Sequence, residues 1–509
     1  MNKLRFVATL LLVAQATLHA MEARHTRPNI ILILADDLGY ADIGVYGAKG
    51  FATPNLDRLA RQGVRFTDFH AAQAVCSASR AAIMTGCYPN RIGIEGAMEP
   101  WFNFGIHERE LTFPQMMKQK GYATGMVGKW HLGRPTEFLP THRGFDEYFG
   151  LPYSNDQWPL HPEKPGVFPP LPLIEGDRVI NPSLSHRDME QLTIQYTERA
   201  VSFIERNKER PFFLYVAHTM PHVPLAVSEK FRGKTKRGLY GDAVEEVDWS
   251  TGEILAALKR HGLEKDTLVM FLSDNGPWLI YGNHAGSAYP LREGKTTTWD
   301  GGTRVPFIAS WPGHIPAGKV CTEMAMTIDL LPTVARLIDA KLPDHKIDGL
   351  DIWPLLAGEK GAKNPHEAYF FYGIPFGVWS GAELESVRTG RWKLILPHTY
   401  RTLGGRKPGM DGWPGEYQKQ PVLEPELYDM MNDMEEHRNV AAKHPETVQK
   451  LLGLAEQCRE DLGDLITHRK GSGVREPGRE TARTSSGFLH RTQRPLSGSC
   501  SPLSDCRAE

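Results

Sequence analysis

Four residues with oxygen-bearing side chains form two adjacent pairs, and each pair directly follows an apolar run. Asp36 and Asp37 follow the run NIILILA, and Asp274 and Asn275 follow TLVMFLS. Carboxylate and amide oxygens are the ligands of hard cations such as Ca²⁺ and Mg²⁺, and no His–Cys constellation that would favour zinc lies at this point of the sequence. Singly, an Asp-Asp pair after a strand is more often a turn or a helix cap.

A cysteine opens the most informative segment, which runs from Cys76 to Gly86 with the sequence CSASRAAIMTG. On its own, a cysteine before a helix is usually a small buried apolar residue. This segment resembles the sulfatase signature, in which a cysteine begins Cys-x-Pro/Ala-Ser-Arg and a Thr-Gly follows. The resemblance implies a sulfuric ester hydrolase whose nucleophile is formylglycine, an aldehyde that is made by oxidation of Cys76 and hydrated to a geminal diol.

The implied reaction is covalent catalysis, which replaces one difficult step by two easier ones. One diol oxygen attacks sulfur, and the other hydroxyl later expels sulfate as the aldehyde re-forms, so that water need not attack a hindered ester. A nucleophile at the start of a helix also lies where the backbone amides favour anions.

One position departs from the commonest form of the signature. Most members of the family have proline where this chain has Ala78. The Cys-x-Ala form is known in bacterial sulfatases and looks like a substrate for anaerobic, radical-type maturation enzymes. We therefore expect a formylglycine-generating enzyme of the radical type as a partner of this chain.

The hexapeptide GKWHLG, residues 128–133, resembles the second sulfatase signature. By that resemblance, Lys129 and Arg80 stabilise the modified residue 76, and His131 takes the proton that lets the covalent intermediate collapse. The alternative is a solvated lysine and a histidine at the edge of the core, in a turn between two glycines. Glycine on both sides indicates close backbone approach, which suits a site.

His222, Lys295 and Ser154 extend the set towards the substrate. A histidine is the natural general acid near neutral pH for the bridging oxygen of a sulfate ester, and a lysine neutralises charge on the sulfate oxygens in the transition state. The family has a His-x-Pro and a Gly-Lys loop at these places. Its arylsulfatase A-like and N-acetylgalactosamine-6-sulfatase-like branch also has a sulfate-contacting serine at the place of Ser154, although a serine in such a turn often only caps it. His218 lacks the His-x-Pro context and ranks lower.

In the resembled family, the counterparts of Asp36, Asp37, Asp274 and Asn275 bind calcium or magnesium, and the metal polarises the sulfate and orients formylglycine. We expect Ca²⁺, with Mg²⁺ as the alternative, on these residues and on residue 76. The expected catalytic residues are Cys76, Arg80, Lys129, His131, His222 and Lys295, and those expected to contact the substrate are Ser154, His222 and Lys295.

These residues can converge only if the elements that carry them end at one edge of a sheet. Continuous apolar runs, typical of strands buried on both faces, occupy residues 29–35, 212–217 and 267–272. Apolar residues at helical spacing occupy residues 53–62, 190–206 and 242–259. Their alternation predicts an α/β fold with a mostly parallel central sheet flanked by helices, which is the alkaline phosphatase-like fold that the resemblance implies. In open α/β sheets, sites form beyond the carboxyl ends of the strands.

The character of the sequence changes after residue 364. Residues 388–396 alternate like an exposed antiparallel strand, residues 426–429 indicate another strand, and residues 446–462 an amphipathic helix. We predict a catalytic domain over 27–364 and a smaller C-terminal α+β domain with an antiparallel sheet over 365–470. Residues 471–509 are rich in Gly, Ser, Arg and Thr without periodicity, which predicts a disordered tail.

The first twenty residues read as a signal peptide. Lys3 and Arg5 precede the apolar run 6–13, and Ala20 is a small residue at which cleavage can occur. The alternative is a buried N-terminal helix. The run is too short to span a membrane, and no later stretch is long and apolar enough. Because no usable Asn-x-Ser/Thr acceptor occurs, we expect an exported bacterial protein, periplasmic or secreted.

Charge and cysteine content exclude other classes. The formal net charge is −1 with no basic stripe, so we expect no nucleic-acid partner. The six cysteines have no zinc-binding pattern.

Three alternatives remain beside a sulfatase. A phosphatase of the alkaline phosphatase superfamily commonly uses Ser or Thr and two zinc ions, whereas this chain offers one oxygen-rich set. A catalytically dead polysaccharide-binding protein requires lesions, and Ala78 is the only variation. A calcium-binding structural protein explains the acidic pairs but not Lys129, His131, His222 and Lys295.

Substrate specificity must come from loops outside this set, such as residues 101–107, 158–172 and 375–383. They carry the aromatic residues Trp101, Phe102, Trp158, Phe376 and Trp379, which could stack on a sugar or aryl ring or could be ordinary packing residues. For an exported enzyme of this kind we expect a sulfate ester on a sulfated glycan.

Overall fold

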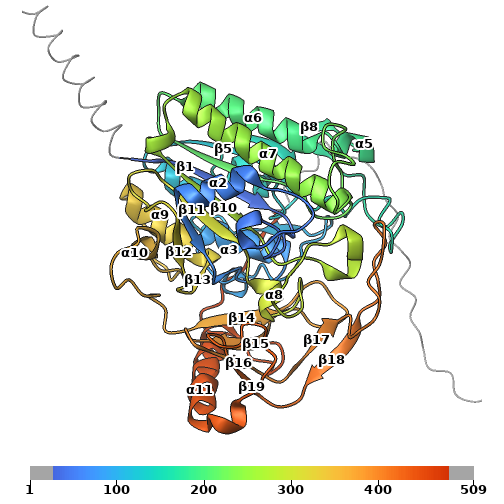
Figure 1. Cartoon of the computed structure of the whole chain (residues 1–509), viewed down its shortest axis with the longest axis vertical. Coiled ribbons are helices and arrows are strands. Elements are labelled where there is room, and N and C mark those ends of the chain that lie inside the picture. Colours follow the sequence, from blue (N-terminus) through green and yellow to red (C-terminus); the bar gives the residue numbers. More distant parts are fainter. Residues whose placement is uncertain (1–26, 481–509) are drawn as a thin grey trace, which may run out of the picture. The chain divides into compact units, whose positions relative to one another are not determined.

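A ten-stranded sheet runs through the centre of the computed structural model, which describes residues 27–480 (Figure 1). In sheet order its strands are β12 (Lys319–Cys321), β2 (Val64–Phe66), β11 (Phe307–Ser310), β10 (Thr267–Ser273), β1 (Asn29–Ala35), β9 (Phe212–Ala217), β5 (Ala123–Lys129), β6 (Glu147–Leu151), β7 (Leu173–Glu175) and β8 (Arg178–Asn181). The five strands β10, β1, β9, β5 and β6 are mutually parallel. The strands at both edges include antiparallel pairs.

Strand β1 shows why the parallel core is apolar throughout. Ile30, Leu32 and Leu34 pack into one core cluster, whereas Ile31 and Ile33 pack into a second cluster on the opposite face. All seven residues of the strand are buried, because helices cover both faces of the sheet.

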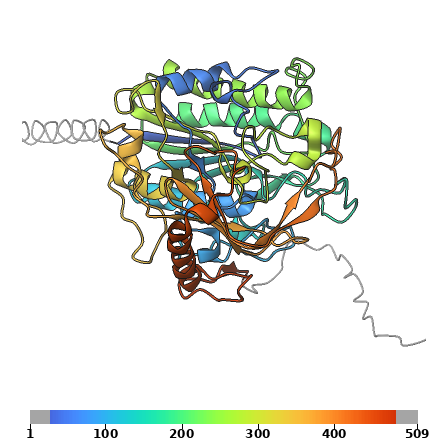
Figure 2. The same ribbon diagram turned by 60° about the horizontal axis from the view of Figure 1, so that its bottom comes forward.

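The helices fall into two layers and a C-terminal group. One face is covered by α2 (Pro54–Gln62), α6 (Leu192–Asn207) and α7 (Leu239–Arg260), and the other by α3 (Cys76–Thr85), α4 (Phe113–Lys118) and α9 (Leu330–Ile338) (Figure 2). The shorter helices are α5 (His186–Met189), α8 (Asp300–Thr303) and α10 (Trp353–Leu356). No helix among the described residues is long and apolar enough to cross a membrane.

A four-stranded antiparallel sheet follows in the C-terminal part of the chain (orange in Figure 1). Its strands are β14 (Tyr369–Gly373), β15 (Glu383–Arg388), β16 (Trp392–Ile395) and β19 (Glu426–Asp429), and α11 (Pro445–Leu462) packs against it. The remaining two-stranded sheets pair β17 (His398–Thr402) with β18 (Gln418–Val422), β3 (Phe69–His70) with β13 (Ala325–Met326), and β4 (Phe104–Gly105) with β20 (Gly478–Arg479). The predicted fold class, a mostly parallel α/β core with a smaller antiparallel α+β part, is confirmed.

One predicted strand is wrong in detail. Residues 388–396 do not form a single exposed strand, because Arg388 ends β15 and β16 begins after a turn. Arg388 and Lys393 are both buried and ion-paired with acidic residues. Alternation of charged and apolar residues does not distinguish a solvated face from a face with buried ionic partners.

The beginning of the predicted disordered tail is ordered. Within residues 471–480, β20 pairs with β4, and the Arg475 guanidinium lies 2.6 Å from the Glu110 carboxylate. The prediction of disorder is therefore wrong for this segment, because polar rather than apolar contacts hold it in place. Residues 481–509 and the predicted signal peptide at 1–20 lie outside the described residues.

Candidate active site

The parallel strands bring the predicted site residues to one edge of the sheet. Asp36 and Asp37 follow β1, and Asp274 and Asn275 follow β10, which pairs in register with β1 so that Ala35 lies opposite Ser273. The two oxygen-bearing pairs are thus direct neighbours. The Asp37 amide donates a hydrogen bond to Asp274 Oδ1 at 3.1 Å.

The other predicted residues come from the same edge. Lys129 ends β5, and β6 is followed by the turn that carries Ser154. Gly128 allows β5 to approach β9, because a Cβ atom there would lie only 1.8 Å from the Ala217 carbonyl oxygen. His222 lies in the loop after β9, and Lys295 lies in the loop that precedes α8.

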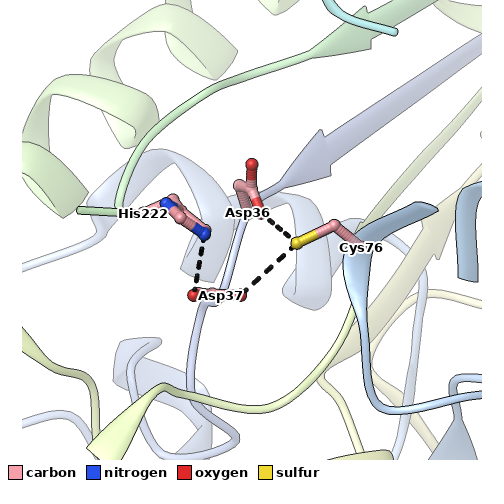
Figure 3. A group of neighbouring side chains, drawn as sticks. All are labelled: Asp36, Asp37, Cys76 and His222. Carbon is pink, nitrogen blue, oxygen red and sulfur yellow. Dashed lines mark hydrogen bonds and ion pairs between the residues drawn. The ribbon is translucent and has the colours of Figure 1, made fainter. Parts of the chain in front are cut away.

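Cys76 is the first residue of α3, and its side chain points at the two carboxylates that follow β1 (Figure 3). Its Sγ lies 3.4 Å from Asp36 Oδ1, 4.0 Å from Asp37 Oδ1 and 3.4 Å from Lys295 Nζ. Burial, reinforced by the charge of Asp36, raises the pKa of the Cys76 thiol well above its usual value. The unmodified thiol is therefore a poor nucleophile, because the thiolate is the reactive form.

Two cations neutralise the carboxylate of Asp36. Lys129 Nζ donates to Asp36 Oδ2 at 2.6 Å and to Ser154 Oγ at 2.9 Å. Arg80, one turn into α3, lies 3.4 Å from Asp36 and 2.9 Å from Asp274 Oδ2. Burial opposes ionisation, but Lys129, His222 and Arg80 hold the pKa of Asp36 well below its usual value.

The proton of the His131 ring lies on Nε2, which leaves Nδ1 free to act as a base. Its Nε2 lies 2.8 Å from the Met98 carbonyl oxygen, which can only accept, so the proton is on Nε2 and Nδ1 carries a lone pair. Nδ1 is buried without a hydrogen-bond partner in the described part of the chain. Burial and the nearby Lys129 lower the pKa of His131 well below its usual value.

His222, Lys295 and Asp37 form a contiguous group. Lys295 Nζ donates to Asp37 Oδ2 at 2.9 Å and to His222 Nε2 at 2.9 Å, and His222 Nδ1 lies 2.5 Å from the Val223 carbonyl oxygen. Burial and the charge of Lys295 lower the pKa of His222. His218, which ranks lower in the sequence, is buried near Tyr196, and neither of its ring nitrogens has a partner in residues 27–480.

The residues present fit a hard cation. Asn275 Nδ2 donates to Asp37 Oδ1 at 2.7 Å, while Asn275 Oδ1 is buried and unpartnered within residues 27–480. Ligand atoms of Asp36, Asp37, Cys76 and His222 lie within 4.8 Å of one another. Asp274 stands outside that compact group, on the side of Arg80, yet it shares the hydrogen-bond network of Asp37. An unused amide oxygen beside carboxylate oxygens is the donor chemistry that calcium and magnesium prefer.

Several residues with left-handed backbone conformations lie in or next to the active site. Asp37 and His131 each have φ of 61°, and Glu293 and Thr296, which flank Lys295, have φ of 57° and 76°. Left-handed conformations are costly for residues with side chains, above all for β-branched threonine, and such strain persists where surrounding structure enforces it.

A second buried group of charges lies where the small sheet meets the rest of the chain, and we call it the junction cluster. It consists of Asp68, His70, Asp300, Arg304, Arg388 and Lys393. Ligand atoms of its two aspartates and its histidine also lie within 4.8 Å of one another. Arginine and lysine donors contact all the carboxylate oxygens of this cluster, and His70 shares one of them, so that in residues 27–480 no acceptor of the cluster is left without a partner.

A cleft of about 60 Å³ leads from the surface to Cys76, and His131, Ser154, His222 and Lys295 line its floor. Sequence patterns did not identify Asp156, Glu99, His161 or Trp278, which also line it. Asp156 and Trp278 lie close in sequence to Ser154 and Asn275, which is a usable signal, whereas Glu99 and His161 come from loops without a motif.

Aromatic residues of the predicted specificity loops divide into two kinds. Trp379 lines the cleft, and Trp101 is 49% exposed and stacks on the cleft residue Phe168. By contrast, Trp158 is buried in the core, and Phe102 stacks on Phe104.

Comparison with known proteins agrees with this geometry. A family described as Sulfatase matches residues 28–340, and one described as N-sulphoglucosamine sulphohydrolase, C-terminal, matches residues 294–403. Arylsulfatase A of Homo sapiens is 39% identical over 84% of this chain and 87% of its own length. N-acetylgalactosamine-6-sulfatase of Mus musculus is 40% identical over 76% of each protein.

Solved structures show the same similarity. The PsFucS1 sulfatase from Pseudoalteromonas sp. superposes with a TM-score of 0.75 at 27% identity, over 87% of this chain and 92% of that chain. Ps i-CgsB in complex with k-i-k-neocarrahexaose gives a TM-score of 0.68 at 30% identity, over 85% and 92%.

Proposed function

The chain belongs to the sulfatase family, and from that premise we propose that it hydrolyses sulfate monoesters of a carbohydrate with a nucleophile made from Cys76. The observation that carries this proposal is the position of Cys76. It begins α3 at the base of a cleft, within 4.0 Å of two aspartates and a lysine. A thiol with a raised pKa is a poor nucleophile in these surroundings, whereas an oxygen nucleophile made from this residue would lie beside the charged groups that its reaction requires.

As formylglycine, residue 76 would supply a hydrated aldehyde, in which one hydroxyl attacks sulfur and the other later expels sulfate. The remaining work falls to side chains already in place. Lys129 and Arg80 stabilise negative charge around residue 76, and the free Nδ1 of His131 takes up the proton released when the intermediate collapses.

Lys295, Ser154 and His222 face the sulfate. Lys295 Nζ and Ser154 Oγ offer hydrogen-bond donors to its oxygens. In the structure His222 Nε2 accepts from Lys295, so this nitrogen must carry a proton before it can donate to the bridging oxygen. That proton leaves with the alcohol as the ester S–O bond breaks.

Asp36, Asp37, Asp274 and Asn275, together with residue 76, would hold a divalent cation. We assign it as Ca²⁺, with Mg²⁺ as the alternative, because every side-chain donor in the set except residue 76 is a hard oxygen. When bound, the cation supplies positive charge that polarises the sulfate.

The substrate class and the maturation partner rest on separate observations. A relative is named N-acetylgalactosamine-6-sulfatase, and a structural neighbour binds a neocarrahexaose, which supports a sulfated carbohydrate. Ala78 donates its amide to the Gly96 carbonyl oxygen at 3.2 Å, a bond that proline could not make. The Cys-x-Ala sequence favours a radical-type maturation enzyme, and with it a bacterial protein exported to the periplasm or secreted.

Hydrolysis of an aryl sulfate beside the matching aryl phosphate tests the proposal. We expect the sulfate to be preferred, and Cys76→Ala to lower kcat/KM for it by at least about 10⁴-fold with an unchanged melting temperature. Cys321→Ala, at the far edge of the main sheet, is the matched control and should retain activity. Preference for the phosphate, or substantial activity of Cys76→Ala, would favour the phosphatase alternative.

A further inference from the structure

The cleft has an outer part that the proposed reaction does not use. Beyond the floor, its walls carry the carboxylates of Asp156, Glu99 and Glu163, and a single lysine, Lys164. On the floor Lys295 supplies positive charge, so the charge of the cleft lining changes from positive to negative between the sulfate site and the mouth of the cleft. Any group attached to the sulfate must lie against this acidic wall.

Asp156 is the deepest of these carboxylates. Its Oδ1 atom is buried and has no hydrogen-bond partner among residues 27–480. Burial opposes ionisation, but His222 and Lys129 lower the pKa of Asp156, so the group is an anion. A buried carboxylate oxygen without a donor is costly, and a ligand hydroxyl that donates to it would remove that cost.

Glu99 lies further out and is partly buried. Burial raises its pKa, whereas Lys164 and a hydrogen bond from Trp101 act in the opposite direction. Trp101 in turn stacks on Phe168, with ring centroids 5.5 Å apart and planes within 12°. The carboxylate and the aromatic surface are therefore held together as one wall.

Two further aromatic residues line the cleft. Trp379 and Trp278 pack edge to face with ring centroids 5.5 Å apart. The Trp379 loop is fixed because its carbonyl oxygen accepts from the Ala97 amide at 2.7 Å and because the Arg401 guanidinium lies over its ring. Aromatic rings and carboxylates that line the same cleft suit the apolar faces and hydroxyl edges of a sugar ring.

His161 adds a donor to the same surface. Its Nδ1 accepts the backbone amides of Glu163 and Lys164 at 3.1 and 3.2 Å, which places the ring proton on Nε2. Burial lowers the pKa of His161, so the ring is neutral and does not attract a second anion.

We propose that this outer cleft is a subsite for a neutral, hydroxyl-bearing sugar ring, and that Asp156 and Glu99 exclude rings that carry a second anionic group. Hydroxyl hydrogens of the ring would donate to the two carboxylates, while a further sulfate or uronate would face like charge. The inference rests on the proposed function for the position of the sulfate. It narrows the substrate from sulfated glycans in general to those with one anionic group at the reacting ring.

Binding to the Cys76→Ala protein tests this without turnover. The ligands are the 6-sulfates of galactose and glucose, each beside its disulfated counterpart, measured by calorimetry at fixed salt. We expect the monosulfated sugar to bind at least about tenfold more tightly, because like-charge contacts oppose the second sulfate. The preference should shrink as salt is raised.

Charge-neutral variants identify the residues responsible. Glu99→Gln and Asp156→Asn keep the shape and an acceptor oxygen, and we expect each to reduce the mono-to-disulfate preference by about fivefold, and their combination to abolish it. Glu424→Gln, an exposed carboxylate outside the cleft, is the matched control and should leave the preference unchanged.

The outcomes separate this inference from the proposed function. Equal or tighter binding of the disulfated sugars, no binding of any sugar in the panel, or an unchanged preference in the double variant would each overturn the subsite. If the unmutated protein hydrolyses no sulfate ester but the binding preference holds, the proposed function fails while the subsite stands. If the protein hydrolyses an aryl sulfate but shows no binding preference, the proposed function stands and the subsite fails.

Discussion

Two buried groups of charge in this molecule have similar composition and different uses. The active-site group around Asp36, Asp37 and Cys76 and the junction cluster around Asp68 and Asp300 each bring carboxylates and a histidine within 4.8 Å. Both also contain lysine and arginine. A cavity of about 930 Å³ lies beside the junction cluster, against about 60 Å³ at Cys76, so neither composition nor cavity size identifies the active site.

The difference lies in unused hydrogen-bonding capacity. In the junction cluster, Arg388 holds Asp68 through both oxygens and Lys393 holds Asp300. Burial opposes ionisation of Asp68, but Arg304 and Arg388 keep its pKa far below its usual value. Among the described residues, the junction cluster leaves a donor, Arg388 Nε, buried without a partner, whereas the active site leaves the acceptors Asn275 Oδ1 and His131 Nδ1 without one. An unpartnered acceptor at the end of a cleft can receive a cation or a proton, whereas an unpartnered donor cannot bind a metal ion.

Among substitutions of charged residues in the two groups, the largest effect on rate should come from removing a cation in the active site. Lys295→Met should lower kcat/KM for an aryl sulfate by about 10²–10³-fold, because it removes a donor to the sulfate oxygens. The melting temperature should fall less than in Arg388→Met, because Asp37 keeps the hydrogen bond from Asn275 Nδ2 when its lysine partner is removed. If Lys295→Met lost much stability but kept normal activity per folded molecule, Lys295 would have a structural role like the charges of the junction cluster.

The next-largest difference between the active-site group and the junction cluster should be in their response to calcium. A chelator that takes calcium should reduce activity by about 100-fold, and more strongly than a zinc-selective chelator. Asp274→Asn should weaken Ca²⁺ binding by at least about tenfold, and Asp300→Asn should leave the calorimetric Kd unchanged. Loss of Ca²⁺ binding in Asp300→Asn, or a stronger effect of the zinc chelator, would contradict the assignment of calcium to the active-site group.

The junction cluster should respond in stability rather than in rate. Arg388→Met leaves Asp68 buried without its bidentate partner and should lower the free energy of unfolding by about 3–5 kcal/mol. Adding Asp68→Asn should recover part of that loss, because the uncompensated charge is gone. Thermal melting and activity per folded molecule measure the two effects, and an unaltered melting temperature for Arg388→Met would contradict the assignment.

The smallest expected effect is a pH dependence of stability through Glu385, which accepts from Thr298 Oγ1 at 2.8 Å in the loop after Lys295. Burial raises the pKa of Glu385 from 4.5 to about 8. The folded state therefore holds the proton more tightly than the unfolded state, so this stabilisation is full below pH 4.5 and is lost as pH rises through about 8.

Glu385→Gln removes that dependence. Between pH 5.5 and 8.5, stability of the unmutated protein should fall relative to the variant by on the order of a few kcal/mol. The charged groups around Glu385 are the same in both proteins: Glu383, Lys393, His398, Arg401 and Asp464. Parallel melting curves across this range would show that Glu385 does not titrate there.

Sequence reasoning succeeded where the signal was local. The run before Asp36 is apolar because both faces of β1 are covered, and a polar pair directly after such a strand must lie at the sheet edge. The signature that begins at Cys76 likewise lies within one helix and the glycine that follows it. These features depend on neighbours in sequence, so one chain is enough to read them.

Other features depend on partners far along the chain. Lys393 is buried because Asp300, 93 residues earlier, lies beside it, and Arg475 orders its segment through Glu110. Glu99 reaches the cleft only because the loop that carries it folds over Cys76. No spacing within a segment reveals such pairings, and they account for the misread strand and tail.

The most direct test of the central claim is the mass of the peptide containing residue 76, on protein purified from its own organism. The account predicts that the thiol sulfur is lost and a carbonyl oxygen is gained, with the other cysteines intact. An unmodified Cys76 in protein that is active on an aryl sulfate would contradict it.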